Sequence, residues 1–187
     1  MTGVSLRVTN HGSTTFRRVL ERATVREILM GAQDNLTNVL AVVLGVTIGA
    51  GRADFVALAG LSAGIAESVS MGGVLYNSTR AERQLAAQGN GHAGPDASRL
   101  SPVLSGVVTA ISSVLAGLVP LAPFAFLPVS SAIWVTMILS LSGLFLLGSV
   151  TGRVAGGGWL VEGLRLVAVA GIAALAAAVV GSTLHVA

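Results

Sequence analysis

Four side chains that can bind a cation lie in two neighbouring apolar segments of the sequence. Asp34 and Asn38 are four residues apart in the first segment, and Glu67 and Met71 are four apart in the second. Residues four apart on an α-helix share a face, so each segment would present two donor groups on one side. A carboxylate in hydrocarbon is costly unless it pairs, binds a metal or takes a proton. We therefore expect these positions to carry the chemistry of the chain.

The types of donor group indicate which cation they would bind. Glu27 precedes Asp34 by seven residues, which places it on the same helix face about 10 Å away along the axis. Oxygen ligands alone would suit Mg²⁺ or Ca²⁺, whereas the Met71 thioether favours a softer transition metal such as Fe²⁺, Mn²⁺, Co²⁺ or Zn²⁺. Buried carboxylates also take protons, so metal and proton can compete for one site, which is a physical basis for antiport. In the alternative interpretation, Asp34 and Glu67 only hydrogen-bond between helices and Met71 fills space.

The composition indicates the class of protein. Of the 187 residues, 53% are hydrophobic and only 10% are charged, and the mean hydropathy is +0.82, whereas a soluble domain carries about 25% charged residues. The chain is therefore expected to be an all-α membrane protein in contact with the lipid bilayer. The net charge of +3 comes from arginines in the short segments between apolar runs, where they indicate topology signals rather than a nucleic-acid partner. Without a visible nucleophile and base pair, we expect no enzyme and no permanent cofactor.

Five apolar stretches follow one another, each near the ~20 residues that a bilayer-spanning helix needs. The segment 1–28 is expected to be a tail followed by a separate basic amphipathic helix on the membrane surface. Residues 29–187 would form a single five-helix transmembrane domain, in which 77–100 is a helical extension through Gln84 and then a loop. The predicted spans are 29–50, 54–76, 102–120, 129–151 and 159–184.

The arginines also predict the orientation in the membrane. One side would hold Arg17, Arg18, Arg22 and Arg26, then Arg80, Arg83 and Arg99, then Arg153, whereas the other holds Arg52. The positive-inside rule then gives a cytoplasmic N-terminus and an external or lumenal C-terminus. All the basic residues are arginines, a weak hint of a bacterial source, so the expected location is an integral multi-pass protein of the bacterial cell membrane.

Helix ends and helix contacts can also be predicted. Ser101 and Pro102 are expected to cap and start the third span, and the glycines at 156–158 to form the last tight turn. Serines of the third and fourth spans would hydrogen-bond to their own helix or across helices. Small residues are expected to let the first two spans approach closely, namely Gly45 and Gly49 on the first and Gly60 and Gly64 on the second.

Several motifs together resemble the vacuolar iron transporter family. Residues 34–37 (Asp-Asn-Leu-Thr) are similar to that family's Asp-Gly-Leu-Thr signature, with Glu27 at the position of a preceding acidic residue. Residues 70–72 (Ser-Met-Gly), followed by Tyr76 and Glu82, are similar to the stretch that closes its second span. Ser101 with Pro102, and the Pro-Leu-Ala-Pro turn at 120–123, resemble the ends of its third span. The match runs over about residues 26–184.

The resemblance implies a homodimer whose first and second spans line a path that moves Fe²⁺ or Mn²⁺ out of the cytosol in exchange for protons. Asp34, Met71 and Glu27 carry over directly as metal-binding positions. The family commonly has a Glu where this chain has Ala63, so Glu67, one turn later, is interpreted as a relocated carboxylate. Better-known members also carry a Glu-rich cytoplasmic domain between the second and third spans. The connection between these spans is short in this chain, which indicates the branch of the family that lacks the domain.

Two functions are therefore left open by the sequence. The first is a proton-coupled transporter of a divalent transition metal, with Asp34, Met71, Glu67, Glu27 and Asn38 as the metal-binding residues. The second is a non-transporting membrane interaction protein that keeps the same scaffold.

Overall fold

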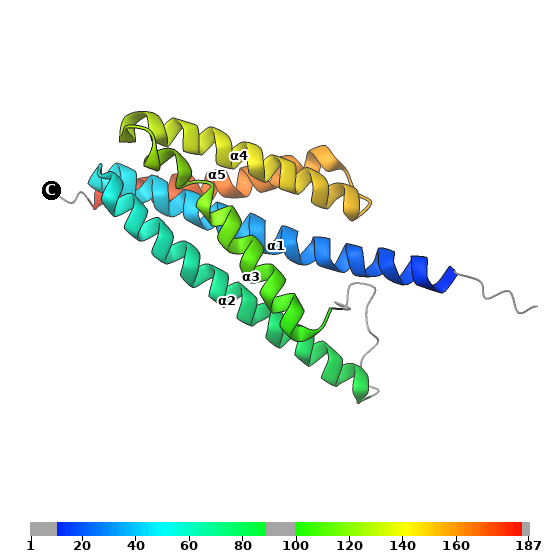
Figure 1. Ribbon diagram of the computed structural model, residues 1–187. Helices are drawn as coiled ribbons and strands as arrows, with labels where there is room; N and C mark the ends of the chain where they lie inside the picture. Colours follow the sequence, from blue (N-terminus) through cyan, green and yellow to red (C-terminus); the bar gives the residue numbers. More distant parts are fainter. Residues whose placement is uncertain (1–10, 89–99, 185–187) are drawn as a thin grey trace, which may run out of the picture.

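The computed structural model describes residues 11–88 and 100–184, with side chains from Thr24 onward. Within these ranges the chain is helical and contains no strand, as Figure 1 shows. The elements are α1 (His11–Ala50), α2 (Ala53–Ala87), α3 (Pro102–Leu118), the short 3-10 helix η1 (Ala122–Ala125), α4 (Val129–Val154) and α5 (Trp159–Thr183).

The helices have the lengths of membrane spans, with one exception. The segment Thr24–Ala50 of α1 and the whole of α2, α4 and α5 are long and apolar enough to cross a bilayer. The apolar helix α3 has 17 residues, which cover about 26 Å of the roughly 30 Å hydrocarbon core. The 3-10 helix η1 continues the chain directly after α3. These elements confirm an all-α membrane protein.

The N-terminal part of α1 differs from the predicted arrangement. A surface helix within 1–28 was expected to be separate from the first span, yet α1 runs without interruption from His11 to Ala50. The sequence offers no break, because residues 13–30 contain neither glycine nor proline. Residues 1–10 lie outside the described part. The second helix α2 extends through Ala87, which confirms the helical extension beyond the second span, and most of the loop that follows lies in 89–99, outside the described residues.

The predicted start of the third span and the predicted glycine turn before the fifth span are confirmed. The Ser101 hydroxyl accepts a hydrogen bond from the Leu104 backbone N–H at 3.2 Å, and Pro102 is the first residue of α3. Gly51 and Gly156 have φ values of 64° and 75° in the turns after α1 and α4, a conformation that favours glycine. Each turn joins two helices that then run antiparallel.

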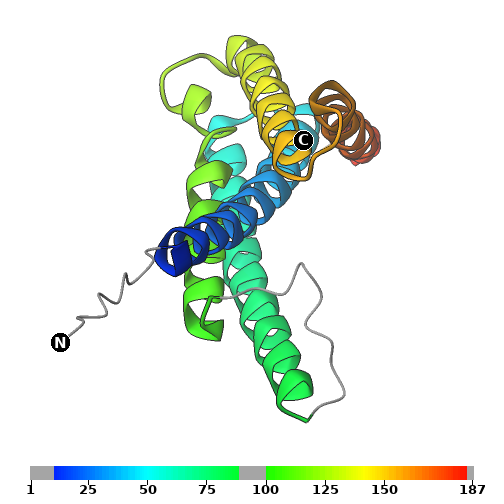
Figure 2. The same ribbon diagram turned by 90° about the vertical axis from the view of Figure 1, so that its right-hand side faces the viewer.

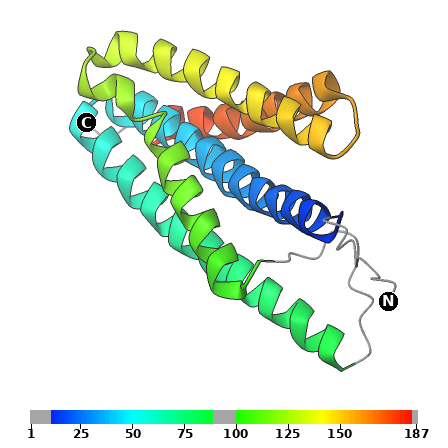
Figure 3. The same cartoon turned by 45° about the vertical axis from the view of Figure 1, so that its right-hand side comes forward.

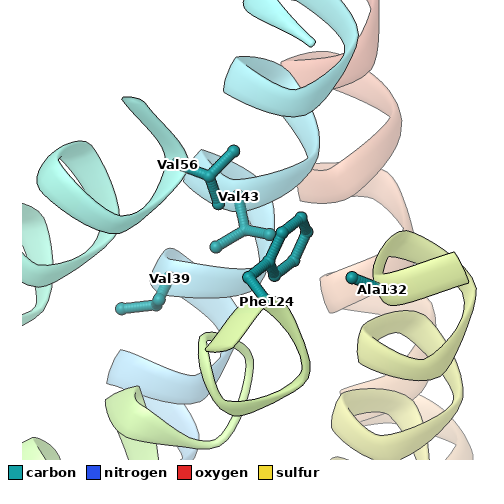
Figure 4. Packing of buried hydrophobic residues seen from close by; sticks show 5 residues of the cluster. All are labelled: Val39, Val43, Val56, Phe124 and Ala132. Carbon is teal, nitrogen blue, oxygen red and sulfur yellow. The ribbon is translucent and has the colours of Figure 1, made fainter. Parts of the chain in front are cut away.

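The central helix of the bundle is α1. Figures 2 and 3 show α2 and α3 packed on one side of α1, and α4 and α5 packed on the other. Two apolar clusters fix this arrangement. Val39, Val43, Val56, Phe124 and Ala132 join α1, α2, η1 and α4 (Figure 4), and a second cluster of Leu36, Leu144 and Ala170 joins α1, α4 and α5.

The glycines of the first span contact α5 rather than α2. A Cβ atom built on Gly45 would lie 3.0 Å from the Ala177 carbonyl oxygen, and one on Gly49 would lie 3.1 Å from the Gly181 carbonyl oxygen. The prediction that these two glycines bring the first two spans together is therefore wrong. Their spacing was interpreted correctly as a close helix contact, but spacing does not identify the partner helix.

The glycines of α2 divide between two neighbours. A Cβ atom on Gly60 would collide with the Leu121 side chain, which follows α3. A Cβ atom on Gly64 would lie 3.2 Å from Val39 Cγ2 of α1. The prediction that these glycines admit the first span thus holds for Gly64 and is wrong for Gly60.

Candidate metal-binding site

The carboxyl group of Glu67 on α2 lies close to two side chains of α1, Asp34 and Asn38. Because α1 and α2 are joined by a turn at Gly51 and Arg52, they run antiparallel, and the three residues lie on adjoining faces. Asp34 and Glu67 are half-buried, whereas Asn38 is exposed on the outside of the single chain.

Met71 adds a sulfur donor to this face. It is half-buried and lies one helical turn after Glu67 on α2. Along the antiparallel pair, Met71 and Asn38 therefore stand at opposite ends of the group, with the two carboxylates between them. Three of the five predicted metal-binding residues, Asp34, Asn38 and Glu67, thus lie close together between α1 and α2, and Met71 is on the same face of α2 as Glu67. We call Asp34, Asn38, Glu67 and Met71 the carboxylate face.

Glu27, the fifth predicted ligand, points into the contact between α1 and α3. Its side chain is only 1% exposed, and its Oε2 accepts a hydrogen bond from Thr109 Oγ1 at 3.3 Å. Gly31, one turn later, also packs on Thr109, whose backbone oxygen a Cβ atom at Gly31 would meet. Glu27 lies two turns from Asp34, or about 10 Å along α1.

The donor set has few strong ligands. Among the residues with described side chains, no group of three or more His, Asp, Glu or Cys residues is placed to hold a metal ion. The carboxylate face therefore provides two carboxylates, one amide and one thioether from a single chain. Such mixed donors suit a transient, cargo-type cation, because a permanent structural site uses a closed shell of strong ligands.

A buried polar cluster behind the carboxylate face was missed by the sequence interpretation. Asn35 Nδ2 donates to Gly64 O at 3.1 Å, to Ser68 Oγ at 3.1 Å and to Ser113 O at 2.8 Å. Ser68 Oγ in turn lies 3.0 Å from Ser113 Oγ. We call Asn35, Ser68 and Ser113 the polar junction, because they link α1, α2 and α3.

Part of the polar junction could have been found from the sequence. Ser105, Thr109, Ser113 and Gly117 recur every four residues on α3, and all four are buried. Ser105 accepts a hydrogen bond from Thr79 of α2 at 3.3 Å. The expected hydrogen bonds of span serines across helices are thus confirmed for Ser105 and Ser113. Met30 was also missed: it is half-buried one turn before Asp34, and its four-residue spacing from Asp34 is visible in the sequence.

Other charged residues form pairs away from this site. Arg52 and Asp54 pair at 2.6 Å in the exposed turn between α1 and α2. Glu162 and Arg165 pair at 3.7 Å at the start of α5. Arg52 also lies over the Phe55 ring, with the guanidinium carbon 4.6 Å from the ring centroid.

The fold and the carboxylate face together define an all-α, multi-span membrane protein with an acidic site between two spans. A family model described as the VIT family matches residues 25–92 and 86–182. The two matches extend over most of the chain, which therefore belongs to the VIT family, the vacuolar iron transporters. Family membership makes membrane metal transport its class of function. None of the curated proteins matches the chain.

Proposed function

We propose that this chain is a proton-coupled transporter that moves Fe²⁺ or Mn²⁺ out of the cytosol. The observation that carries the proposal is the interaction of Asp34 with Glu67 between two membrane-crossing helices. Two half-buried carboxyls within a membrane span are costly to keep, and such groups usually serve an ion or a proton. The Met71 thioether on the same face favours a transition metal over Mg²⁺ or Ca²⁺.

The proton coupling follows from the contact between the two carboxyls. Like charges this close in a poorly solvated environment cannot both remain uncompensated. Either a proton or a divalent cation can supply the compensating charge, and a ligand carboxylate must lose its proton before the metal binds. Metal arriving from one side would therefore release a proton, and a proton arriving from the other side would release the metal.

The proposal includes a homodimer and a direction of transport. Asn38 is exposed, and the two carboxylates beside it are only half-buried in a single chain. Lipid tails cannot hydrogen-bond these groups, so a second copy packed on the carboxylate face would shield them and could add its own donors. The arginine distribution supports a cytoplasmic N-terminus. A proton gradient directed into the cytoplasm would then drive metal outward.

Metal flux into proteoliposomes with an imposed pH gradient tests this function. The native chain is expected to move Mn²⁺ or Fe²⁺ faster when the gradient is present, and Asp34→Ala and Glu67→Gln are each expected to abolish most of the flux. Asp54→Asn is the matched control, since it removes a carboxylate that is exposed in a turn. Its flux should equal that of the native chain.

Two results would contradict the proposal. One is the absence of Mn²⁺ and Fe²⁺ flux in a native chain that assembles normally, which would support a non-transporting membrane interaction protein instead. The other is unchanged flux in both Asp34→Ala and Glu67→Gln. Flux that is independent of the pH gradient would remove the proton coupling while keeping metal transport.

A further inference from the structure

The side chain of Asn35 lies at the point where three helices meet. It is fully buried and fits between two glycines: a Cβ atom on Gly64 of α2 would lie 3.7 Å from Asn35 Nδ2, and one on Gly117 of α3 would lie 2.5 Å from it. At Gly117 any larger residue would therefore collide with the amide, whereas at Gly64 a Cβ atom would only be in van der Waals contact with it. The amide is thus enclosed by α2 and α3 as well as held by its hydrogen bonds.

The hydrogen bonds of Asn35 tie α1 to both neighbouring helices. Its Nδ2 has three acceptors within 3.1 Å, two on α2 and one on α3. An amide group has only two hydrogens, so the three acceptors share them. Ser68, one of these acceptors, also donates to Gly64 O at 2.7 Å. Sliding α2 along α1 by one residue would break this set.

The polar junction is directly adjacent in sequence to the carboxylate face. Asn35 follows Asp34 on α1, and Ser68 follows Glu67 on α2. In an antiparallel helix pair, the residues that precede two facing residues both point to the same side of the helix contact. Asp34 and Glu67 precede Asn35 and Ser68 in this way. Moving one residue back shifts the position along the common axis by about 1.5 Å in opposite directions on the two helices, so Asp34 and Glu67 are offset along the axis by about 3 Å. That geometry agrees with the proximity of the two side chains.

We propose that Asn35 is a positioning residue whose hydrogen bonds to Gly64, Ser68 and Ser113 set the register of α1 against α2, and thereby hold Asp34 opposite Glu67. Asn35 does not touch the metal in this arrangement, because it is enclosed by α2 and α3 on the other side of the contact. The claim that this register sets metal affinity rests on the proposed function. The claim about the register itself does not.

Disulfide cross-linking tests the register without any metal. The chain contains no cysteine, so paired cysteines can be introduced into the full-length protein in membranes. The aligned pair Asp34→Cys with Glu67→Cys is expected to cross-link several times faster than the offset pair Asp34→Cys with Ala63→Cys. Adding Asn35→Ala should reduce the ratio of the two rates toward one. An unchanged ratio would overturn the proposal.

Mn²⁺ binding to the purified full-length chain provides the second readout. Loss of a residue that orients metal ligands typically lowers metal affinity by about 10- to 100-fold, and this is the expected effect of Asn35→Ala. Ser68→Ala removes one acceptor and should have a smaller effect, whereas Ser113→Ala leaves all three Asn35 bonds in place and should have the least. If Asn35→Ala does not fold, the comparison of Ser68→Ala with Ser113→Ala still tests the proposal.

Thr136→Val is the matched structural control. Thr136 is fully buried and donates to Pro120 O at 2.9 Å, in the contact between α4 and the turn after α3. The Thr136→Val substitution should lower the melting temperature while leaving Mn²⁺ affinity and the cross-linking ratio unchanged. Equal loss of affinity in Thr136→Val and Asn35→Ala would overturn the positioning role. If the native chain binds no Mn²⁺, the proposed function fails, and the cross-linking ratio still decides whether Asn35 sets the register.

Discussion

Thr109 of α3 donates a hydrogen bond at 3.3 Å to the buried carboxyl of Glu27 on α1. Both side chains are almost completely removed from the surface, so neither can exchange this contact for one with water. The contact joins α1 to α3, and Figure 3 shows that α2 diverges from α1 toward the N-terminal end of α1.

Replacing Thr109 by valine is expected to destabilise the protein. The substitution keeps the side-chain shape and removes the donor, and a buried acceptor left without its partner typically costs about 1–3 kcal/mol. Thr136→Val removes a bond to a neutral carbonyl, for which about 0.5–1.5 kcal/mol is typical. Unfolding in mild detergent with increasing denaturant would measure both. Equal losses would show that the Glu27 carboxyl is not the stronger acceptor.

Replacing Met71 by leucine is expected to change metal selectivity rather than folding. Leucine has a similar volume, and such exchanges usually cost less than about 1.5 kcal/mol, but it removes the thioether. Competition assays should therefore show a smaller preference for Fe²⁺ over Mg²⁺. Met137→Leu on α4 is the control, since Met137 is also half-buried and lies outside the carboxylate face. The same loss of selectivity in both variants would argue against a sulfur ligand.

Adding a methyl group at Gly117 is expected to displace Asn35. Its Cβ would lie 2.5 Å from Asn35 Nδ2, and such overpacking typically costs about 1–3 kcal/mol. Gly73→Ala is the control, because a Cβ at Gly73 has nothing within 4 Å, and alanine is the better helix former. Thermal unfolding should separate the two variants, with Gly73→Ala as stable as the native chain. If Gly117→Ala is as stable as the native chain, the side chains and helices around Asn35 can move enough to accommodate the added methyl group.

Single cysteines can test the homodimer. In the proposed arrangement, Asn38 lies under a second copy, so Asn38→Cys should form an intermolecular disulfide in membranes under mild oxidation. Ile138→Cys is the control, because Ile138 is 68% exposed on α4, on the side of α1 away from α2 and α3. Cross-linking of the control at the same rate would indicate random collision, and absence of an Asn38→Cys dimer would contradict this interface.

The helices and much of the carboxylate face follow from residue type and spacing. Long apolar runs, the Ser101 and Pro102 start of α3 and the turn glycines are local features, and local features determine where helices begin and end. The proximity of Asp34 and Glu67 was expected from two four-residue spacings and a short turn, because a short turn favours antiparallel packing of neighbouring helices.

The sequence did not predict which helix each of these residues contacts. Gly45 could face any helix, and the choice of α5 depends on how the fourth and fifth helices pack on α1. Glu27 and Asp34 are on nearly the same side of α1, yet Glu27 contacts α3 whereas Asp34 lies close to α2. The continuous α1 was missed because a basic amphipathic pattern is equally compatible with a surface helix and with the extension of a span.

The position of α1 between two helix pairs has a mechanical consequence. On one side its glycines meet the backbone of α5 directly, a contact that leaves little room for sliding. On the other side the hydrogen bonds of Asn35 join α1 to α2 and α3, and Gly31 packs on the Thr109 backbone of α3. Moving α2 and α3 away from α1 would separate Asp34 from Glu67, and this movement would have to break the Asn35 hydrogen bonds first. The same amide that sets the register would therefore also set the free energy needed to open the contact between α1 and α2.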